Sequence, residues 1–299
     1  MKKYVYTLLC GAVAALPAAA EIEVSDQLTL SGFIDMSATS VDDVKSMSLD
    51  QAEVDFHFDM GDGLTARADI EGRPDTDFVL EQAFMSYDMG NGVAITAGKF
   101  LSCSGWETAE PTGLYQFSTS ATLVYGGYQH GVAASYGQEK FGLYGAVVSS
   151  VWDGTDTDAE EVGFEVQASL MPVEEVTAKV AFLSEDMGGY NTTLINAWGA
   201  YFAGPLTLAA EVNLLSNWLV EDNDGTGFLL MANYALTDKV GVTGRFSSLD
   251  TDAMADAATE FTISPSYAVT DNWALLAEVR FDDDGGSFQS YAVESLLTF

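Results

Sequence analysis

Apolar and polar side chains alternate with a period of two residues along almost the whole chain after residue 26. The last nine residues, YAVESLLTF, set an apolar row that ends at Phe299 against a row that carries Glu294. Successive side chains of a β-strand point to opposite faces, so this period predicts strands rather than helices. A chain that repeats the pattern in most of its segments is expected to be all-β.

The connections between the alternating segments are of two alternating kinds. Tight turns such as MGDG (60–63), GNG (90–92) and TDK (237–239) are followed along the chain by longer, acidic connections such as WDGTDTDAEE (152–161) and LDTDAMADA (249–257). A soluble sandwich also alternates, but it has no reason to collect acidic residues in every second loop. The asymmetry favours a transmembrane antiparallel β-barrel with short periplasmic turns and longer outer loops.

Counting the segments between these connections predicts about 16 strands, an even number that places both chain ends on the periplasmic side. The expected strand centres are Ile34, Asp55, Ala68, Phe84, Ile95, Ala133, Ala146, Val166, Ala178, Ala197, Ala210, Met231, Val242, Ile263, Leu276 and Glu294. The third outer connection, about residues 102–126, is the longest.

The first 20 residues have the features of a secretory signal peptide. Lys2 and Lys3 precede the apolar run YVYTLLCGAVAALP, and Ala18–Ala20 form a small-residue cleavage site. The run is too short to span a membrane, and Leu9 before Cys10 argues against a lipoprotein. We therefore expect a signal peptide over residues 1–20 and one barrel domain over residues 21–299, with no domain boundary within it.

Charge and composition exclude several classes of protein. The formal net charge is −34, which argues against a nucleic-acid partner, since such proteins need a basic surface. A hydrophobic content of 48% argues against the disorder that an acidic chain could otherwise adopt. The uncharged stretches 111–138 and 187–210 are too polar to be membrane helices. On length alone a two-domain soluble secreted protein stays open.

Catalytic and metal-binding patterns are weak. Asp55, His57 and Asp59 share a face and Ser135 lies near His130, but alternation alone produces such neighbours, so we expect no enzyme activity. The segment DNDGTG (222–227) resembles the start of a calcium loop but has Asn233 where the acidic twelfth ligand belongs. The sequence therefore predicts neither a cofactor nor a dedicated metal site, although clustered loop acids could bind divalent ions weakly. Cys103 is interpreted as a tolerated loop thiol.

Two segments carry a family resemblance. The first, residues 80–120, has a strand, a tight turn, a strand ending in AGKF and a long loop; its sequence is LEQAFMSYDMGNGVAITAGKFLSCSGWETAEPTGLYQFSTS. The second, residues 262–281, shows the same family resemblance; its sequence is TISPSYAVTDNWALLAEVRF. The chain resembles the trimeric porins of Gram-negative bacteria and related β-barrel porins. The resemblance implies an outer-membrane location, a homotrimer, a third loop folded into the barrel as a constriction, and a terminal strand ending at Phe299 that the barrel-assembly machinery reads.

The non-apolar row of the predicted strands would line a water-filled lumen. Its charged members are Asp35, Glu53, Asp55, Asp59, Arg67, Asp69, Glu71, Glu165, Lys179, Glu211, Arg245, Glu278 and Arg280. Acids outnumber bases, and acidic rings favour cations, although any one of these side chains could simply be solvated or paired. Arg67, Arg245 and Arg280 fall on one arc of wall. In the resemblance they would face Glu107 and Glu110 of the constriction loop across the pore.

Aromatic residues near the strand ends suit the membrane interface, although β-strands favour aromatics in any case. They are Trp106, Tyr128, Tyr136, Trp152, Tyr201, Trp218, Tyr234, Tyr267, Trp273 and Phe299. The expected function is passive diffusion of small hydrophilic solutes, with cations preferred, through a pore surrounded by outer-membrane lipid. A substrate-specific channel and a plugged structural barrel stay open as alternatives.

Overall fold

The computed structural model describes residues 21–299 apart from 42–43, 75, 108–109, 159 and 161, so the predicted signal peptide lies outside the described residues. Seventeen strands and one short 3-10 helix make up its secondary structure. No helix among the described residues is long and apolar enough to cross a membrane.

The strands follow one another in a single antiparallel order. Their bounds are β1 (Ile22–Ser25), β2 (Leu28–Val41), β3 (Val44–Gly61), β4 (Leu64–Gly72), β5 (Val79–Gly90), β6 (Val93–Leu101), β7 (Tyr128–Gly137), β8 (Phe141–Val148), β9 (Gly163–Val173), β10 (Val176–Asp186), β11 (Asn191–Ala203), β12 (Leu206–Ser216), β13 (Gly225–Ala235), β14 (Val240–Thr251), β15 (Ala258–Thr270), β16 (Trp273–Asp283) and β17 (Ser287–Thr298). The 3-10 helix η1 is Pro111–Gly113.

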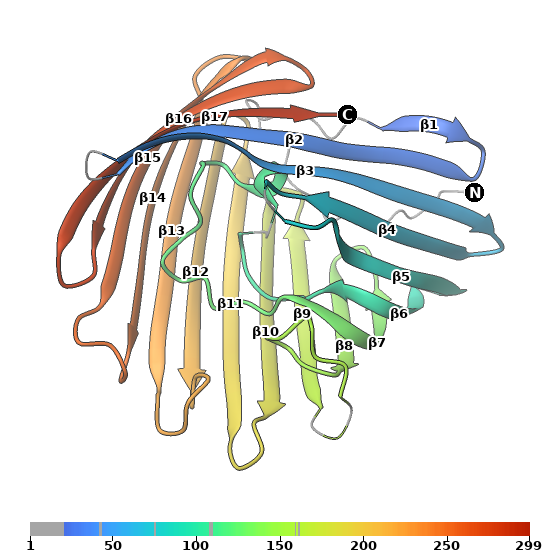
Figure 1. Cartoon of the computed structure of the whole chain (residues 1–299). Coiled ribbons are helices and arrows are strands. Elements are labelled where there is room, and N and C mark those ends of the chain that lie inside the picture. Colours follow the sequence, from blue (N-terminus) through green and yellow to red (C-terminus); the bar gives the residue numbers. More distant parts are fainter. Residues whose placement is uncertain (1–20, 42–43, 75, 108–109, 159, 161) are drawn as a thin grey trace.

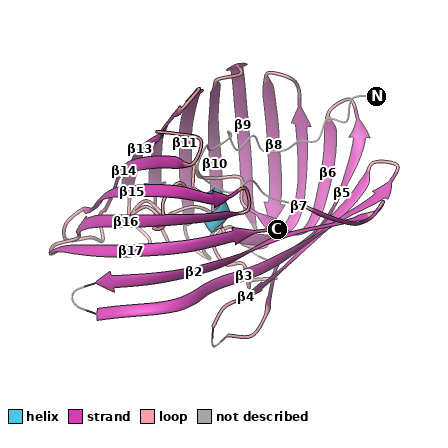
Figure 2. Cartoon of the chain, turned by 90° about the horizontal axis from the view of Figure 1, so that it is seen from above, coloured by secondary structure: helices cyan, strands magenta, loops and turns pink. Residues whose placement is uncertain are grey.

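The sheet closes on itself, because each strand from β2 to β16 pairs with the next and β17 pairs with β2 (Figures 1 and 2). The short β1 pairs with the start of β2. The closed barrel therefore has 16 strands, as predicted, and each expected strand centre lies within one of them. Closure leaves no unpaired strand edge, which is what a sheet in lipid requires.

The burial pattern is reversed relative to a soluble protein. One row of each strand, here called the outer row, is apolar and exposed, as for Val132 (55%), Leu230 (54%) and Val293 (54%). The other, the inner row, is largely polar, and Asn213 and Thr243 on it are fully buried. An apolar band this extensive is stable only against lipid, and polar side chains belong around an aqueous interior.

Tight turns connect the strands at one end of the barrel. Asp62 and Gly63 between β3 and β4, and Asn91 and Gly92 between β5 and β6, have positive φ, the conformation that Asn/Asp-Gly hairpin turns require. Longer connections lie at the other end. The sequence pattern also predicts a longer acidic connection at VDDVK (41–45), and this prediction is wrong, since β2 extends to Val41 and β3 begins at Val44.

Outer-row aromatics mark the tight-turn end of several strands. Tyr136, Tyr201, Tyr234, Tyr267 and Trp273 are all substantially exposed near these turns, where a membrane interface would hold them. Four predicted members of this belt lie elsewhere. Trp106, Trp152 and Trp218 are partly buried against the hydrophobic clusters formed by the long loops and the wall. Tyr128 begins β7 at the long-loop end, and its hydroxyl is buried beside inner-row carboxylates.

Candidate functional site

The segment between β6 and β7, residues 102–127, runs across the inner side of the wall and is here called the internal loop (Figure 1). Its backbone amides donate to carboxylates of three separate strands. Cys103 N donates to Glu165 Oε2 on β9 over 3.2 Å. Trp106 N donates to Glu211 Oε2 on β12 over 2.5 Å, and Ser118 N donates to Glu278 Oε2 on β16 over 3.1 Å. Three predicted pore-lining acids are thus acceptors for the loop backbone.

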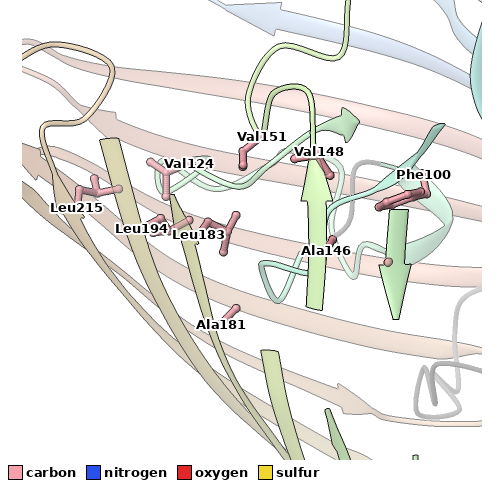
Figure 3. Close-up of a cluster of buried hydrophobic side chains, with 10 residues drawn as sticks. Phe100, Val124, Ala146, Val148, Val151, Ala181, Leu183, Leu194 and Leu215 are labelled. Atoms are coloured by element: carbon pink, nitrogen blue, oxygen red, sulfur yellow. The ribbon is translucent and has the colours of Figure 1, made fainter. Parts of the chain in front are cut away.

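Apolar packing supports the base of the internal loop. Val124 of the loop and Val151 of the β8–β9 connection lie in one buried cluster with Phe100, Leu183 and Leu194 (Figure 3). Burial of these side chains gains about 25 cal/mol for each Å² of apolar surface removed from water. The loop is therefore fixed by the hydrophobic effect at its base and by hydrogen bonds along its length.

An aromatic cluster covers another part of the inner wall. The Trp106 ring of the internal loop lies 5.2 Å, edge to face, from Trp198 on β11 and 6.2 Å from Tyr115. Lys179 Nζ on β10 lies 5.1 Å from the centre of the Trp198 ring, a cation–π distance. The expectation of Trp106 in an interfacial belt is wrong, because its loop folds against β11 and β12.

Arg245 on β14 is the most heavily bonded side chain at the internal loop. Its Nη1 donates to Glu107 Oε1 over 2.8 Å, and its Nη2 donates to Glu260 on β15. The guanidinium also donates to the Ser118 carbonyl and, over 3.1 Å, to the Thr119 carbonyl. The planar fork of arginine suits such multiple contacts. This ion-pair network joins two wall strands to the loop without access to solvent.

The predicted separation between basic wall and acidic loop is wrong at Arg245, which contacts Glu107 directly. Arg67 on β4 lies 2.8 Å from Asp69, 3.6 Å from Asp55 and 4.0 Å from Glu110. Burial raises the pKa of Glu110, and the charge of Arg67 opposes that rise. Loop and wall charges pair because the loop lies against the wall at these points.

The other predicted pore-lining residues also lie on the inner row. Glu53, Asp55 and Glu71 are buried, and Glu71 pairs with Arg73. Asp35 on β2 is buried, with Oδ1 lacking a hydrogen-bond partner. Asp59 differs in being exposed near the tight-turn end of β3, where its Oδ1 accepts from Gly61 N.

Arg280 on β16 completes the predicted set of inner-row charges. Its Nε donates to Asp282 over 2.8 Å, and its side chain is 27% exposed. Arg280 therefore keeps contact with water, unlike Arg245, whose side chain is fully buried.

Sequence reasoning missed three buried inner-row acids, namely Glu81, Glu185 and Glu260, and it placed Glu294 on the non-apolar row without including it among the lining charges. Glu260 could have been found, because it alternates with Phe261 and Ile263 in β15. Glu81 could not, since a register shift in the β4–β5 pairing leaves both Glu81 and Gln82 buried. Such a shift interrupts the two-residue period.

Cys103 lies in the internal loop as a free thiol. Burial and the neighbouring Glu165 carboxylate raise its pKa well above the usual range. A thiol that stays protonated is a poor nucleophile, which agrees with its interpretation as an inert loop residue.

The sequence matches the family model described as "Putative beta-barrel porin-2, OmpL-like" over residues 42–295. Among curated proteins no relative matches. The fold is similar to OmpF of Salmonella typhi, with a TM-score of 0.75 and 13% identity over 94% of this chain and 100% of that one.

Two further solved structures share the fold. An anion-selective porin from Comamonas acidovorans has a TM-score of 0.69 and 16% identity, and the match covers 91% of this chain and 99% of that one. OmpT of Vibrio cholerae, described in a trimer form, has a TM-score of 0.69 and 12% identity over the same shares of the two chains.

Proposed function

The chain belongs to the OmpL-like β-barrel porin family, and from this membership we propose that it forms a water-filled pore for passive diffusion of small hydrophilic solutes, with a preference for cations. The protein is a barrel of the bacterial outer membrane, as are the porins that share its fold. The proposed activity is transport without chemical conversion of the solute.

The observation that carries the cation preference is the charge of the inner row. Most of its buried charged groups are carboxylates, and Arg245 and Arg67 are already engaged by neighbouring acids. Shared fold does not set the sign of selectivity, since a porin of this fold is anion-selective. The side chains of the inner row must therefore set it, and a net acidic lining attracts cations.

The test uses acids that do not anchor the internal loop. Asp35 on β2 and Glu294 on β17 are buried inner-row neighbours on the two strands whose pairing closes the barrel. In planar bilayers with a salt gradient, we expect the wild type to show a cation-selective reversal potential. The D35N/E294Q variant should have a several-fold lower cation-to-anion permeability ratio.

The matched control is E174Q/E175Q, which removes two charges from the exposed β9–β10 turn and should leave the ratio unchanged. Equal ratios for the wild type and D35N/E294Q would contradict the proposed filter. Saturable solute flux would favour a substrate-specific channel instead, and the absence of any conductance would favour a plugged structural barrel.

We also propose that three copies assemble in the membrane, because a barrel of the same fold is described as a trimer. Cross-linking of the purified protein in detergent tests this assembly. A trimer band that disappears on heating is expected, and a strictly monomeric species would contradict it.

A further inference from the structure

A group of carboxylates meets where the internal loop passes β3 and β5. Glu53 on β3, Glu81 on β5 and Glu110 of the internal loop each place one carboxylate oxygen within 4.8 Å of the other two. Glu53 is 1% exposed and Glu81 is 7% exposed. Asp55 and Asp69 form a second, overlapping group with Glu53.

Two oxygens of this group have no hydrogen-bond donor. Glu53 Oε2 accepts from Gln51 Nε2 over 2.9 Å, but Glu53 Oε1 is buried without a partner, and so is Glu81 Oε2. Glu211 and Glu185 on the inner wall show the contrast, since both oxygens of each accept hydrogen bonds. A buried acceptor without a donor is costly, so its presence points to a missing positive partner.

Nearby basic side chains do not supply that partner. The short contacts of Arg67 are to Asp69 and Asp55, and it reaches Glu110 only at 4.0 Å. Arg73 pairs with Glu71. No salt bridge to Glu53 or Glu81 occurs among the described residues. The hydroxyl of Tyr128 on β7 is buried beside all three glutamates and interacts most directly with Glu81, but it is neutral and brings no positive charge to the group.

We propose that Glu53, Glu81 and Glu110 bind a calcium ion that ties the internal loop to β3 and β5. Hard divalent cations prefer carboxylate oxygens, and Ca²⁺ holds them at about 2.3–2.6 Å, so two ligands of one ion lie at most about 5.2 Å apart. The 4.8 Å limit within the group satisfies this condition. Ligands from two strands and a loop suit the flexible geometry of Ca²⁺ better than the strict octahedron of Mg²⁺.

The ion would also remove an electrostatic conflict. Three carboxylates this close repel one another, and burial weakens the screening of that repulsion by water. A bound divalent cation compensates two negative charges and supplies partners for Glu53 Oε1 and Glu81 Oε2. The site does not depend on whether the lumen conducts.

The experiment uses the folded, full-length barrel in detergent after removal of metals with a chelator. Ca²⁺ is titrated in a calorimeter, and thermal unfolding is followed by circular dichroism with and without Ca²⁺. We expect the E53Q/E81Q variant to bind Ca²⁺ at least tenfold more weakly than the wild type and to lose the Ca²⁺-dependent rise in melting temperature. Without metal this variant should melt above the wild type, because the repulsion is reduced.

The control E174Q/E175Q has the same charge change on an exposed turn and should respond to Ca²⁺ as the wild type does. An equal Ca²⁺ response of the wild type and E53Q/E81Q would overturn the site and assign binding to the outer loops. If acid but not Ca²⁺ stabilises the wild type, the calcium site is overturned. The close approach of the carboxyl groups would then be explained by protons that they share. Equal responses to Mg²⁺ and Ca²⁺ would overturn the choice of ion.

Bilayer recordings separate this proposal from the pore function. A barrel that binds Ca²⁺ at Glu53 and Glu81 but does not conduct would contradict only the proposed pore function. A barrel that conducts but shows no Ca²⁺ response in detergent would contradict the calcium site alone.

Discussion

Arg245 is a fully buried charge whose side chain joins the internal loop to β14 and β15. A buried ion pair gives little net stability over an apolar replacement, because desolvation of both charges is costly. Loss of one partner is different, since it leaves the other charge buried and uncompensated. The same arginine therefore positions the loop and makes the loop contact sensitive to substitution.

The R245M variant should be strongly destabilised, by about 3–5 kcal/mol, because Glu107 and Glu260 lose their shared partner. The matched control is R280M, which removes a partly exposed arginine paired with Asp282 and should cost about 1 kcal/mol or less. Chemical unfolding in detergent measures both. Equal losses would show that the buried network does not hold the loop.

At the scale of elements, the seam between β17 and β2 closes the barrel beside the last residue. Phe299 N donates to the Gly32 carbonyl over 3.0 Å, and Gly32 N donates to the Phe299 carbonyl over 2.8 Å. The Phe299 ring lies directly over Gly32, so closely that a Cβ there would come within 2.7 Å of the ring. The glycine leaves the space that the terminal aromatic ring occupies.

Deletion of Phe299 should lower the amount of folded barrel in the outer membrane several-fold, since it removes the ring and both hydrogen bonds. G32A should have the same direction of effect, because its methyl group would clash with the Glu53 carbonyl oxygen on β3 and lie 2.7 Å from the ring. T298S, which changes the neighbouring inner-row residue, should assemble normally. Quantification of heat-modifiable protein in membrane fractions checks this, and normal levels of the deletion variant would contradict the role of the seam.

The strands were predictable from sequence because two-residue alternation follows directly from strand geometry. It located all sixteen strands of the barrel and placed residues such as Glu165 and Glu278 on the inner row. It failed at Glu81, where a bulge interrupts the alternation. It also failed for the loop contacts, since backbone amides such as Trp106 N donate irrespective of side chain, and their acceptors are set by tertiary structure alone.

At the scale of the whole molecule, the tight turns and the longer connections lie at opposite ends of one closed sheet. An outer-membrane barrel directs its longer loops outward. Cysteines introduced at Thr155 and Ala255 should therefore react with a membrane-impermeant maleimide on intact cells, and one at Asp238 should react only after lysis. Cys103 is partly buried and its pKa is raised, so it gives little background. The opposite labelling pattern would reverse the assigned orientation.

Salt concentration should control the selectivity of the whole pore. Charges in water are screened over about 10 Å at 0.1 M ionic strength and over about 3 Å at 1 M. The proposed cation preference is therefore expected to be largest in dilute salt and to fall steadily as salt is added. Reversal potentials at a fixed concentration ratio and rising absolute concentration test this, and a constant preference would contradict an electrostatic filter.

The hydrogen bonds of the internal loop also impose an order on assembly. Ser118 and its acceptor Glu278 are 160 residues apart in the chain, and Glu107 and Arg245 are 138 apart. Contacts this distant in sequence form slowly, because a long chain segment must be ordered first. The loop can reach these two partners only once β14 and β16 are in place, so these contacts are expected to form after its contacts to Glu165 on β9 and Glu211 on β12, when the wall is nearly complete.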